Sequence, residues 1–409
     1  MAHTADQAAP FATGAYPTRH HPGSFDVLSD DAYLSLGAME GMYPAIVETI
    51  RPTEAPKPRE TVWPGYVLAM TTAAAAYIIG HIMLPDVGAA IIAIVAGAAV
   101  RNLLPVPATT GAGCRRIVRK GIPVAIILMG AGLNLTLFRS IGLPALFITV
   151  GGIVVSMVGA YYCGRALGLE PRTALLIGAG TGICGNSAIV AVAPLIDAED
   201  DDLVLSMGTV NLFGMLVVLV WPLIGTVLAL NDGQYGVWCG TTIHAVPQVA
   251  AAGFARGADS DAGAIATAVK LVRVTLLAPM MVVLAMMYAR RHVADGASGS
   301  RVIIHYARLV PGFVWGFVAL ALLNTLGLLP SIQFDIGEPW RDAARSFSFS
   351  MAGLFKESGK VLLTLAMAAI GLEVNIRLLG RVGGRAVLTG FIVTVLLAVF
   401  SLVLVRLFV

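Results

Sequence analysis

The sequence predicts an all-α polytopic membrane protein, and its composition is the first evidence for that fold class. Of the 409 residues, 57% are hydrophobic and only 12% are charged, whereas a soluble domain carries about 25% charged residues. The net charge of +3 is small and the basic residues fall mostly in short loops, so no nucleic-acid partner is expected. The four cysteines lack the spacing of metal ligands, and neither a metal nor a cofactor is expected.

About eleven apolar runs are long enough to cross a bilayer, for which a helix needs about 20 residues. They lie near residues 64–83, 86–104, 121–138, 142–164, 172–196, 203–230, 235–256, 264–289, 308–329, 355–376 and 384–408. These runs define a transmembrane domain over residues 61–409. Residues 1–60 are polar and form an N-terminal extension, in which residues 33–50 are expected to form one amphipathic helix.

Basic residues are concentrated after alternate runs, whereas residues 197–202 are acidic. The basic residues lie at or after the ends of the second, fourth, eighth and tenth runs. They are Arg101, Arg115, Arg116, Arg119, Lys120, Arg165, Arg172, Arg290, Arg291, Arg301, Arg308, Arg377, Arg381 and Arg385. Because cytoplasmic loops are enriched in lysine and arginine, this pattern predicts a cytoplasmic N-terminus and extension, and an outward C-terminus.

Two of the runs, residues 172–196 and 235–256, are interrupted by glycines and polar residues. Each could cross as a broken helix or return as a re-entrant hairpin. Gly180-Thr181-Gly182-Ile183 in the first run has an echo in Gly240-Thr241-Thr242-Ile243 in the second. Another similar pair consists of residues 129–134, at an expected outer membrane end, and residues 369–375, at an expected inner one. Together the two pairs predict inverted repeats, which in transporters surround a binding site at the membrane midplane.

The first interruption is the strongest candidate site. Gly180-Thr181-Gly182-Ile183-Cys184-Gly185-Asn186-Ser187 places three glycines, two hydroxyls and an amide between apolar flanks. An unpaired backbone polar group costs several kcal/mol in hydrocarbon, so such a break persists only inside protein or against a polar ligand. A half-helix that begins near Gly185 would direct its backbone N–H groups toward an anion. The alternative is that the glycines only allow helices to pack closely.

The second interruption reads Gly240-Thr241-Thr242-Ile243-His244-Ala245-Val246-Pro247-Gln248. Pro247 removes a backbone donor and disturbs the helix. His244 and Gln248 are four residues apart and share a helix face. His244 could bind substrate or relay protons; it could instead lie at the interface and bond a carbonyl. The candidate binding residues of this break are Thr241, Thr242, His244 and Gln248.

Lys270 and Arg273 lie inside the eighth run, roughly 9 and 14 Å from a helix start near Ala264. Charges inside a membrane are costly and usually face a pathway or a partner. No acidic residue lies in the central part of a run between residues 121 and 289, so we expect both cations to face an anionic substrate. Snorkelling to the surface is the alternative. The clearest intramembrane acid, Glu373, lies near an inner helix end, which disfavours sodium–proton exchange.

Four motifs resemble those of the YeiH-type sulfate exporter family, in the order of that family. They are residues 180–194, 244 with 248–254, 269–273 and 365–372. The resemblance covers roughly residues 62–409 and implies an inner-membrane transporter related to the sodium–proton antiporter and bile-acid symporter folds. It also implies inverted repeats and discontinuous helices at the midplane. The family often has Asp at the position after His244, where this chain has Ala245. The resemblance therefore assigns no coupling acid to this position.

These observations predict a secondary active transporter of a small anion, with sulfate or a sulfonate favoured. Its substrate-binding residues would be Thr181, Gly182, Cys184, Gly185, Asn186, Ser187, Thr241, Thr242, His244, Gln248, Lys270 and Arg273. The expected partners are the anion, the lipid bilayer and a coupling ion, either a proton or sodium; a homodimer is left open. No ATP-binding loop of the G-x-x-x-x-G-K-[ST] type is present.

Two alternatives remain at this point. One is a sodium-coupled carboxylate or bicarbonate transporter in which backbone carbonyls at the breaks hold the cation. The other, from a different class, is an intramembrane enzyme that uses Cys184 or Ser187 as nucleophile. The chain is not expected to be an enzyme, because no carboxylate is available to orient His244 as a base.

Overall fold

The computed structural model describes residues 61–82, 88–107, 109–257, 260–294, 312–336, 345–375 and 383–409. The predicted N-terminal extension with its amphipathic helix lies outside the described residues, as do Arg301, Arg308, Arg377 and Arg381. Each predicted apolar run contains at least one described helix, so the chain is an all-α polytopic membrane protein. By length and composition, four of the described helical stretches could each cross a membrane: Ile141–Ala166, Asp200–Val227, Ala262–Met287 and Gly384–Phe408.

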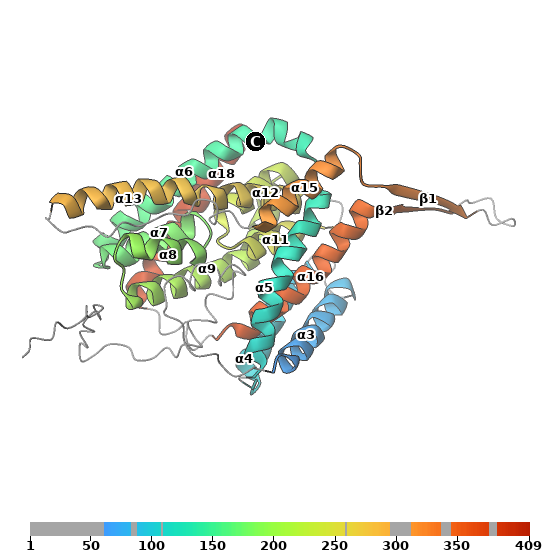
Figure 1. Cartoon of the computed structure of the whole chain (residues 1–409), viewed down its shortest axis with the longest axis horizontal. Coiled ribbons are helices and arrows are strands. Elements are labelled where there is room, and N and C mark those ends of the chain that lie inside the picture. The colour runs from blue at the N-terminus through green and yellow to red at the C-terminus, as the bar shows by residue number, and fades with distance from the viewer. Residues whose placement is uncertain are drawn as a thin grey trace, which may run out of the picture.

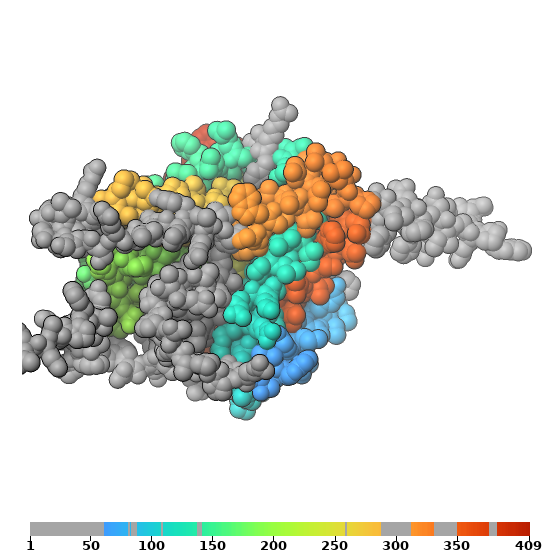
Figure 2. Space-filling view, viewed as in Figure 1, coloured from blue at the N-terminus to red at the C-terminus, as the bar shows by residue number. Residues whose placement is uncertain are grey.

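One group of helices forms a bundle that we call the panel (Figure 1). Its members are α3 (Trp63–Ile82), α4 (Ala89–Leu103), α5 (Thr110–Met129), α15 (Gly312–Thr325) and α16 (Met351–Glu373). Glycines bring these backbones together, because a Cβ atom on Gly97 of α4 would clash with the Ala368 carbonyl of α16. Small residues at such contacts are typical of membrane helices. Figure 2 shows the surfaces of α3 and α5, in blue and teal, beside that of α16.

The remaining helices form a second bundle, which we call the core. It consists of α6 (Phe138–Ala166), α7 (Pro171–Gly182), α8 (Asn186–Val192), α9 (Asp200–Val227), α10 (Asp232–Thr242), α11 (Val246–Phe254), α12 (Ala262–Thr275), α13 (Leu277–Ala294) and α18 (Gly384–Phe408). Short 3-10 turns η1 (Gly130–Gly132) and η2 (Leu135–Leu137) connect the panel to the core, and η3 (Ala193–Leu195) extends α8. Helix α11 of the core contacts α4 and α16 of the panel.

The first interrupted run is a re-entrant hairpin formed by α7 and α8 (Figure 1). A Cβ atom on Gly180 would lie 3.0 Å from the Ile189 side chain, whereas nine residues of continuous helix would separate these positions by about 13 Å. The hairpin also returns to its starting end, since Arg172 pairs with Glu199 at 3.5 Å. The acidic residues 197–202 therefore lie on the same side as Arg172, as the re-entrant alternative requires.

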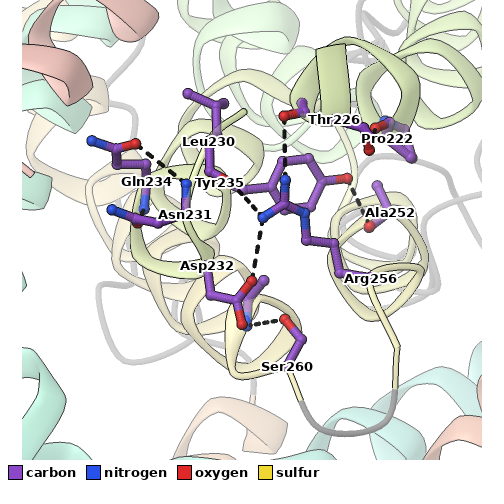
Figure 3. Close-up of polar contacts among 12 residues, drawn as sticks. Pro222, Thr226, Leu230, Asn231, Asp232, Gln234, Tyr235, Ala252, Arg256 and Ser260 are labelled. Carbon is purple, nitrogen blue, oxygen red and sulfur yellow. Dashed lines mark hydrogen bonds and ion pairs between the residues drawn. The ribbon is translucent and has the colours of Figure 1, made fainter. Parts of the chain in front are cut away.

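The second interrupted run is also a re-entrant hairpin, formed by α10 and α11. The Arg256 guanidinium, just after α11, donates to the carbonyl of Leu230 at 2.5 Å and contacts Asp232 at 3.3 Å, both at the start of α10. The same group lies 4.5 Å from the centre of the Tyr235 ring, and the Tyr235 hydroxyl donates to the Ala252 carbonyl at 2.9 Å. Figure 3 shows this cluster, which joins the two ends of the hairpin.

The two hairpins enter the core from opposite ends. The base of the first contacts the beginning of α9, where Thr173 donates a hydrogen bond to Asp202. The base of the second contacts the end of α9, where Arg256 donates to the Gly225 carbonyl at 3.2 Å. A helix of 28 residues is about 42 Å long. The two tips therefore approach each other from opposite membrane surfaces, which agrees with the predicted inverted arrangement.

Helix α5 differs from the predicted run at residues 121–138. It begins at Thr110 and ends at Met129, so four basic residues lie in a helix where the sequence predicts a loop: Arg115, Arg116, Arg119 and Lys120. Arg116, Arg119 and Lys120 are exposed, because long basic side chains can extend along a helix toward its polar end.

The eighth run also differs from the prediction, since it forms two helices, α12 and α13. Pro279 has no N–H to bond the carbonyl four residues earlier.

A small β-hairpin lies between α15 and α16, where the sequence analysis predicts no regular structure. Strand β1 (Ser331–Ile336) pairs antiparallel with β2 (Arg345–Ser350), and Figure 1 shows the pair projecting from the panel. Both segments alternate polar and apolar residues, SIQFDI and RSFSFS, which is the period of a strand. A search for apolar runs of membrane length does not detect segments of six residues.

Large apolar side chains cover the outside of the described helices. Leu103, Leu143 and Val227 are each at least 80% exposed, and Trp63 is 71% exposed. Exposed apolar surface on this scale marks an interaction site rather than a water-facing surface. It fits the predicted contact with the lipid bilayer.

Candidate functional site

The tips of the two hairpins meet at a pair of buried cations on α12. The Lys270 ammonium donates to the carbonyl oxygens of Ile183, at 2.7 Å, and Ile243, at 2.8 Å. These carbonyls follow α7 and α10 respectively, so a single side chain joins both tips. We call the two side chains, Lys270 and Arg273, together with the carbonyls they bind, the junction.

Arg273 completes the junction one helical turn further along α12. Its guanidinium donates to the carbonyls of Thr181 and Gly182 at the end of α7. It also donates to the Ile243 carbonyl at 3.1 Å. Lys270 is 0% exposed and Arg273 1% exposed. Neither side chain snorkels to the membrane surface, and both lie inside the protein as predicted.

The C-terminal end of α7 leaves backbone carbonyls that need hydrogen-bond donors from outside the helix. The last carbonyls of a helix have no donor within the helix. Here the Ala179 and Gly180 carbonyls accept from the amides of Ile183 and Gly185. The next three carbonyls, of Thr181, Gly182 and Ile183, are the ones that Arg273 and Lys270 bind. The sequence analysis expects these cations to face a substrate. In the structure, both donate hydrogen bonds to the carbonyls at the break in the first hairpin.

Backbone dipoles balance only part of the charge at the junction. A helix C-terminus carries roughly half a negative charge, so α7 and α10 together supply about one negative charge against the two positive side chains. The core helices contain acidic residues only at their ends, such as Asp202 in α9 and Asp232 in α10. The junction therefore concentrates two positive side chains inside the protein, close to the beginnings of α8 and α11.

His244 lies in the turn between α10 and α11, directly after the carbonyl that both cations bind. It is 1% exposed, and neither ring nitrogen has a hydrogen-bond partner among the described residues. A buried polar group without a partner costs about 1–3 kcal/mol. In the first turn of α11, the Gln248 side chain accepts a hydrogen bond from the Ala245 amide at 3.1 Å. His244 is thus a predicted residue that is buried with both ring nitrogens unbonded to the described residues.

Residues after the first tip contact the middle of α9. Gly185 has φ of +70°, a conformation that strongly favours glycine, and it ends the turn from which α8 begins. The Asn186 side chain then donates to the Asn211 side chain at 2.9 Å. Gln248 of the second hairpin packs against Gly214, one turn further along α9. Both tips thus lie near the midpoint of a membrane-length helix.

Other predicted residues have structural contacts. The Thr241 hydroxyl lies 2.6 Å from that of Ser401 in α18, and the Thr242 hydroxyl accepts a hydrogen bond from the Trp221 indole at 2.7 Å. Cys184 is buried and Ser187 is half-buried, beside the first tip. Thr241 and Thr242 therefore belong to the packing of the second hairpin rather than to the surface of the junction.

Close helix packing requires a glycine at two positions, one in each break. A Cβ atom on Gly182 would clash with the Ser156 hydroxyl of α6. One on Gly240 would lie 2.7 Å from the Ala266 carbonyl of α12. These glycines bring the hairpins close to α6 and α12, which is how Lys270 and Arg273 come within reach of the tip carbonyls.

Asn211 and Ser156 are contacts that the sequence analysis missed. Asn211 is the single side-chain amide in the sixth apolar run, and Ser156 is the single serine in the fourth. An isolated polar residue in a membrane helix is a usable signal, since such residues tend to face a partner inside the protein. Asn211 could have been found in this way.

A surface cavity of about 1040 Å³ opens at the base of the first hairpin. The beginnings of α7, α9 and α18 line it, with Arg172, Glu199 and Arg385 among the charged residues. None of the predicted site residues lines this cavity. It therefore lies at the base of the first hairpin and not at the junction.

Comparison with known proteins relates the chain to bacterial membrane proteins. A family model described as conserved hypothetical protein 698 matches residues 64–405. The chain is 33% identical to UPF0324 membrane protein Atu0671 of Agrobacterium fabrum over 332 residues, which is 79% of this chain and 84% of that protein. It is 30% identical to UPF0324 membrane protein TauZ of Paracoccus denitrificans over 345 residues, 83% of this chain and 94% of that protein. No solved structure matches.

Proposed function

The chain belongs to the UPF0324 family of membrane proteins, which confirms the family predicted from its motifs, and we propose that it is a secondary transporter of small anions. The observation that supports this proposal is the buried pair Lys270 and Arg273, which joins the tips of two re-entrant hairpins. Only about half of their charge is balanced by helix ends. An anion that reaches this point would complete the balance.

We propose sulfate or a sulfonate as the first substrates to test. Such oxyanions accept several hydrogen bonds at once, and the junction is bordered by groups that donate them. These include the His244 ring and the Val246 and Gln248 amides in the first turn of α11, where a helix N-terminus favours negative charge. On this proposal Lys270 and Arg273 supply the positive potential while they remain bound to the backbone.

Alternating access would move the core against the panel. Both hairpins and α12 lie in the core, so the binding site would move as one unit. The panel packs its own helices tightly and meets the core through few elements, chiefly α11 against α4 and α16. A rigid bundle that slides along a limited interface is a common arrangement for transport.

We assign the protein to a bacterial inner membrane. The end of the molecule where α7 and α18 begin would face the cytoplasm. Basic residues gather at this end, including Arg165, Arg172 and Arg385, and basic residues favour the cytoplasmic side. The C-terminus then lies outside, where Arg406 donates to the Leu228 carbonyl. On this assignment the polar residues 1–60 are a cytoplasmic extension of a transporter domain at residues 61–409.

We propose transport rather than catalysis. An enzyme that used Cys184 or Ser187 would need His244 oriented as a base by another polar group. Neither ring nitrogen of His244 has such a partner among the described residues.

The test is a binding panel on purified protein, followed by transport. Thermal unfolding is measured with sulfate, sulfite, taurine, bicarbonate and dicarboxylates, and each stabilising anion is then tested for uptake into proteoliposomes. His244→Ala should weaken binding of the stabilising anion at least about tenfold, a loss of about 1.4 kcal/mol. The substitution also leaves a cavity at this buried position but breaks no hydrogen bond among the described residues, so affinity is measured on the folded variant.

Thr242→Val is the matched control from the same hairpin. It removes the bond from Trp221 and should lower stability while leaving the affinity for the anion unchanged. Equal affinity of His244→Ala and the parent protein would place the anion elsewhere. Stabilisation by none of the anions, together with no uptake, would contradict the proposed substrate class.

A further inference from the structure

The junction has the form of a binding site for a monovalent cation. The carbonyls of Ile183 and Ile243 come from the C-terminal ends of two half-helices that enter from opposite membrane surfaces. In transporters with broken helices, such carbonyls and C-terminal ends coordinate the coupling sodium ion or proton. Here the Lys270 ammonium lies between them, at 2.7 and 2.8 Å.

An ammonium group resembles a small metal cation in the properties that matter here. It is a compact point charge with three donors that turn to suit the acceptors, unlike the planar guanidinium beside it. It reaches the carbonyls from α12, a third element, and the whole lysine side chain is 0% exposed. The protein thus supplies its own cation covalently, at a position that two separate chain segments enclose.

We propose that Lys270 is a resident substitute for a coupling cation, and that its removal uncovers a site for ammonium-type or sodium ions between the Ile183 and Ile243 carbonyls. The consequence for coupling, that transport does not depend on sodium at this position, rests on the proposed transport function. The cation site itself does not. It depends only on the two carbonyls and on the space that the side chain leaves.

The first experiment measures thermal unfolding of Lys270→Ala in chloride salts of methylammonium, ammonium, sodium and choline at equal ionic strength. Methylammonium should fit best, because it replaces the charged end and part of the stem that the substitution removes. Saturating binding should raise the midpoint by at least about 2 °C above the choline value. The parent protein should show no difference among the four salts, since its own ammonium fills the site.

Two further variants keep the test decisive. Lys360→Ala removes a lysine from the panel, where it pairs with Glu357 at 2.8 Å, and should gain no response to any of these cations. Lys270→Met leaves an apolar side chain between the carbonyls and should also respond less than Lys270→Ala. If Lys270→Ala folds only when methylammonium is present during purification, that dependence supports the proposal.

The proposal is overturned if Lys270→Ala unfolds at the same temperature in methylammonium as in choline. It is also overturned if Lys270→Met folds while no cation recovers Lys270→Ala. None of these measurements includes the transported anion, so failure of the cation site and failure of the anion function are separate results. For the coupling consequence, uptake by the parent protein should be unchanged when choline replaces sodium on both sides of the membrane.

Discussion

The two re-entrant hairpins are alike at their tips and different at their bases. Both tips end in backbone carbonyls that α12 binds through Lys270 and Arg273. At the base, the second hairpin is closed by Arg256, which is 18% exposed and bonds two carbonyls as well as Asp232. The first is closed partly by Arg172 and Glu199, whose side chains are 43% and 79% exposed.

This difference suggests which hairpin can move. Exposed ion pairs contribute roughly 0–1 kcal/mol, whereas bonds from a partly buried guanidinium to carbonyls contribute more. The first hairpin also has the large cavity at its base. We infer that the second hairpin is the fixed wall of the site, held by Arg256 and by its close packing on α12. The first is the wall whose base has the weaker contacts and can adjust within the core.

The largest effect is expected where the hairpins are joined. Arg273→Gln leaves the Thr181 and Gly182 carbonyls without their donor, and each buried unsatisfied group costs about 1–3 kcal/mol. The free energy of unfolding should fall by roughly 2–6 kcal/mol, measured by denaturant unfolding in detergent. Arg273→Lys keeps the charge and should lose less. Unchanged stability of Arg273→Gln would show that the junction does not hold the hairpins together.

The next effect tests the fixed wall. Arg256→Ala removes the bonds to the Leu230 and Gly225 carbonyls and the contact with the Tyr235 ring. We expect a loss of roughly 2–3 kcal/mol. Hydrogen exchange should increase in α10 and α11 and stay unchanged in α7 and α8. An equal increase in both hairpins would mean that Arg256 supports the whole core and not one hairpin.

Sequence could predict where the chain breaks but not which way it turns. The residues 180–187 and 240–248 interrupt apolar runs with glycines and polar groups, so both breaks follow from composition. A crossing helix and a hairpin of the same length have the same hydropathy, so re-entry depends on contacts such as Gly180 with Ile189. The partners of Lys270 lie 87 and 27 residues away in the chain, and only the folded core brings them together.

A third prediction compares glycines at the two tips. Gly185→Ala forces a side chain into a backbone conformation with φ of +70° and should cost roughly 1–3 kcal/mol through strain at the first tip. Gly240→Ala should cost a similar roughly 1–3 kcal/mol by overpacking α10 against α12. The two differ in location: hydrogen exchange should rise in α8 for the first variant and in α10 and α12 for the second. Reversed patterns would contradict these roles.

The smallest effect is expected at the base of the first hairpin. Arg172→Ala removes an exposed ion pair with Glu199 and should lower the free energy of unfolding by less than about 1 kcal/mol. Because the same residue lines the cavity, its loss should still increase hydrogen exchange locally in α7. A loss as large as that of Arg256→Ala would remove the contrast between a fixed and an adjustable wall.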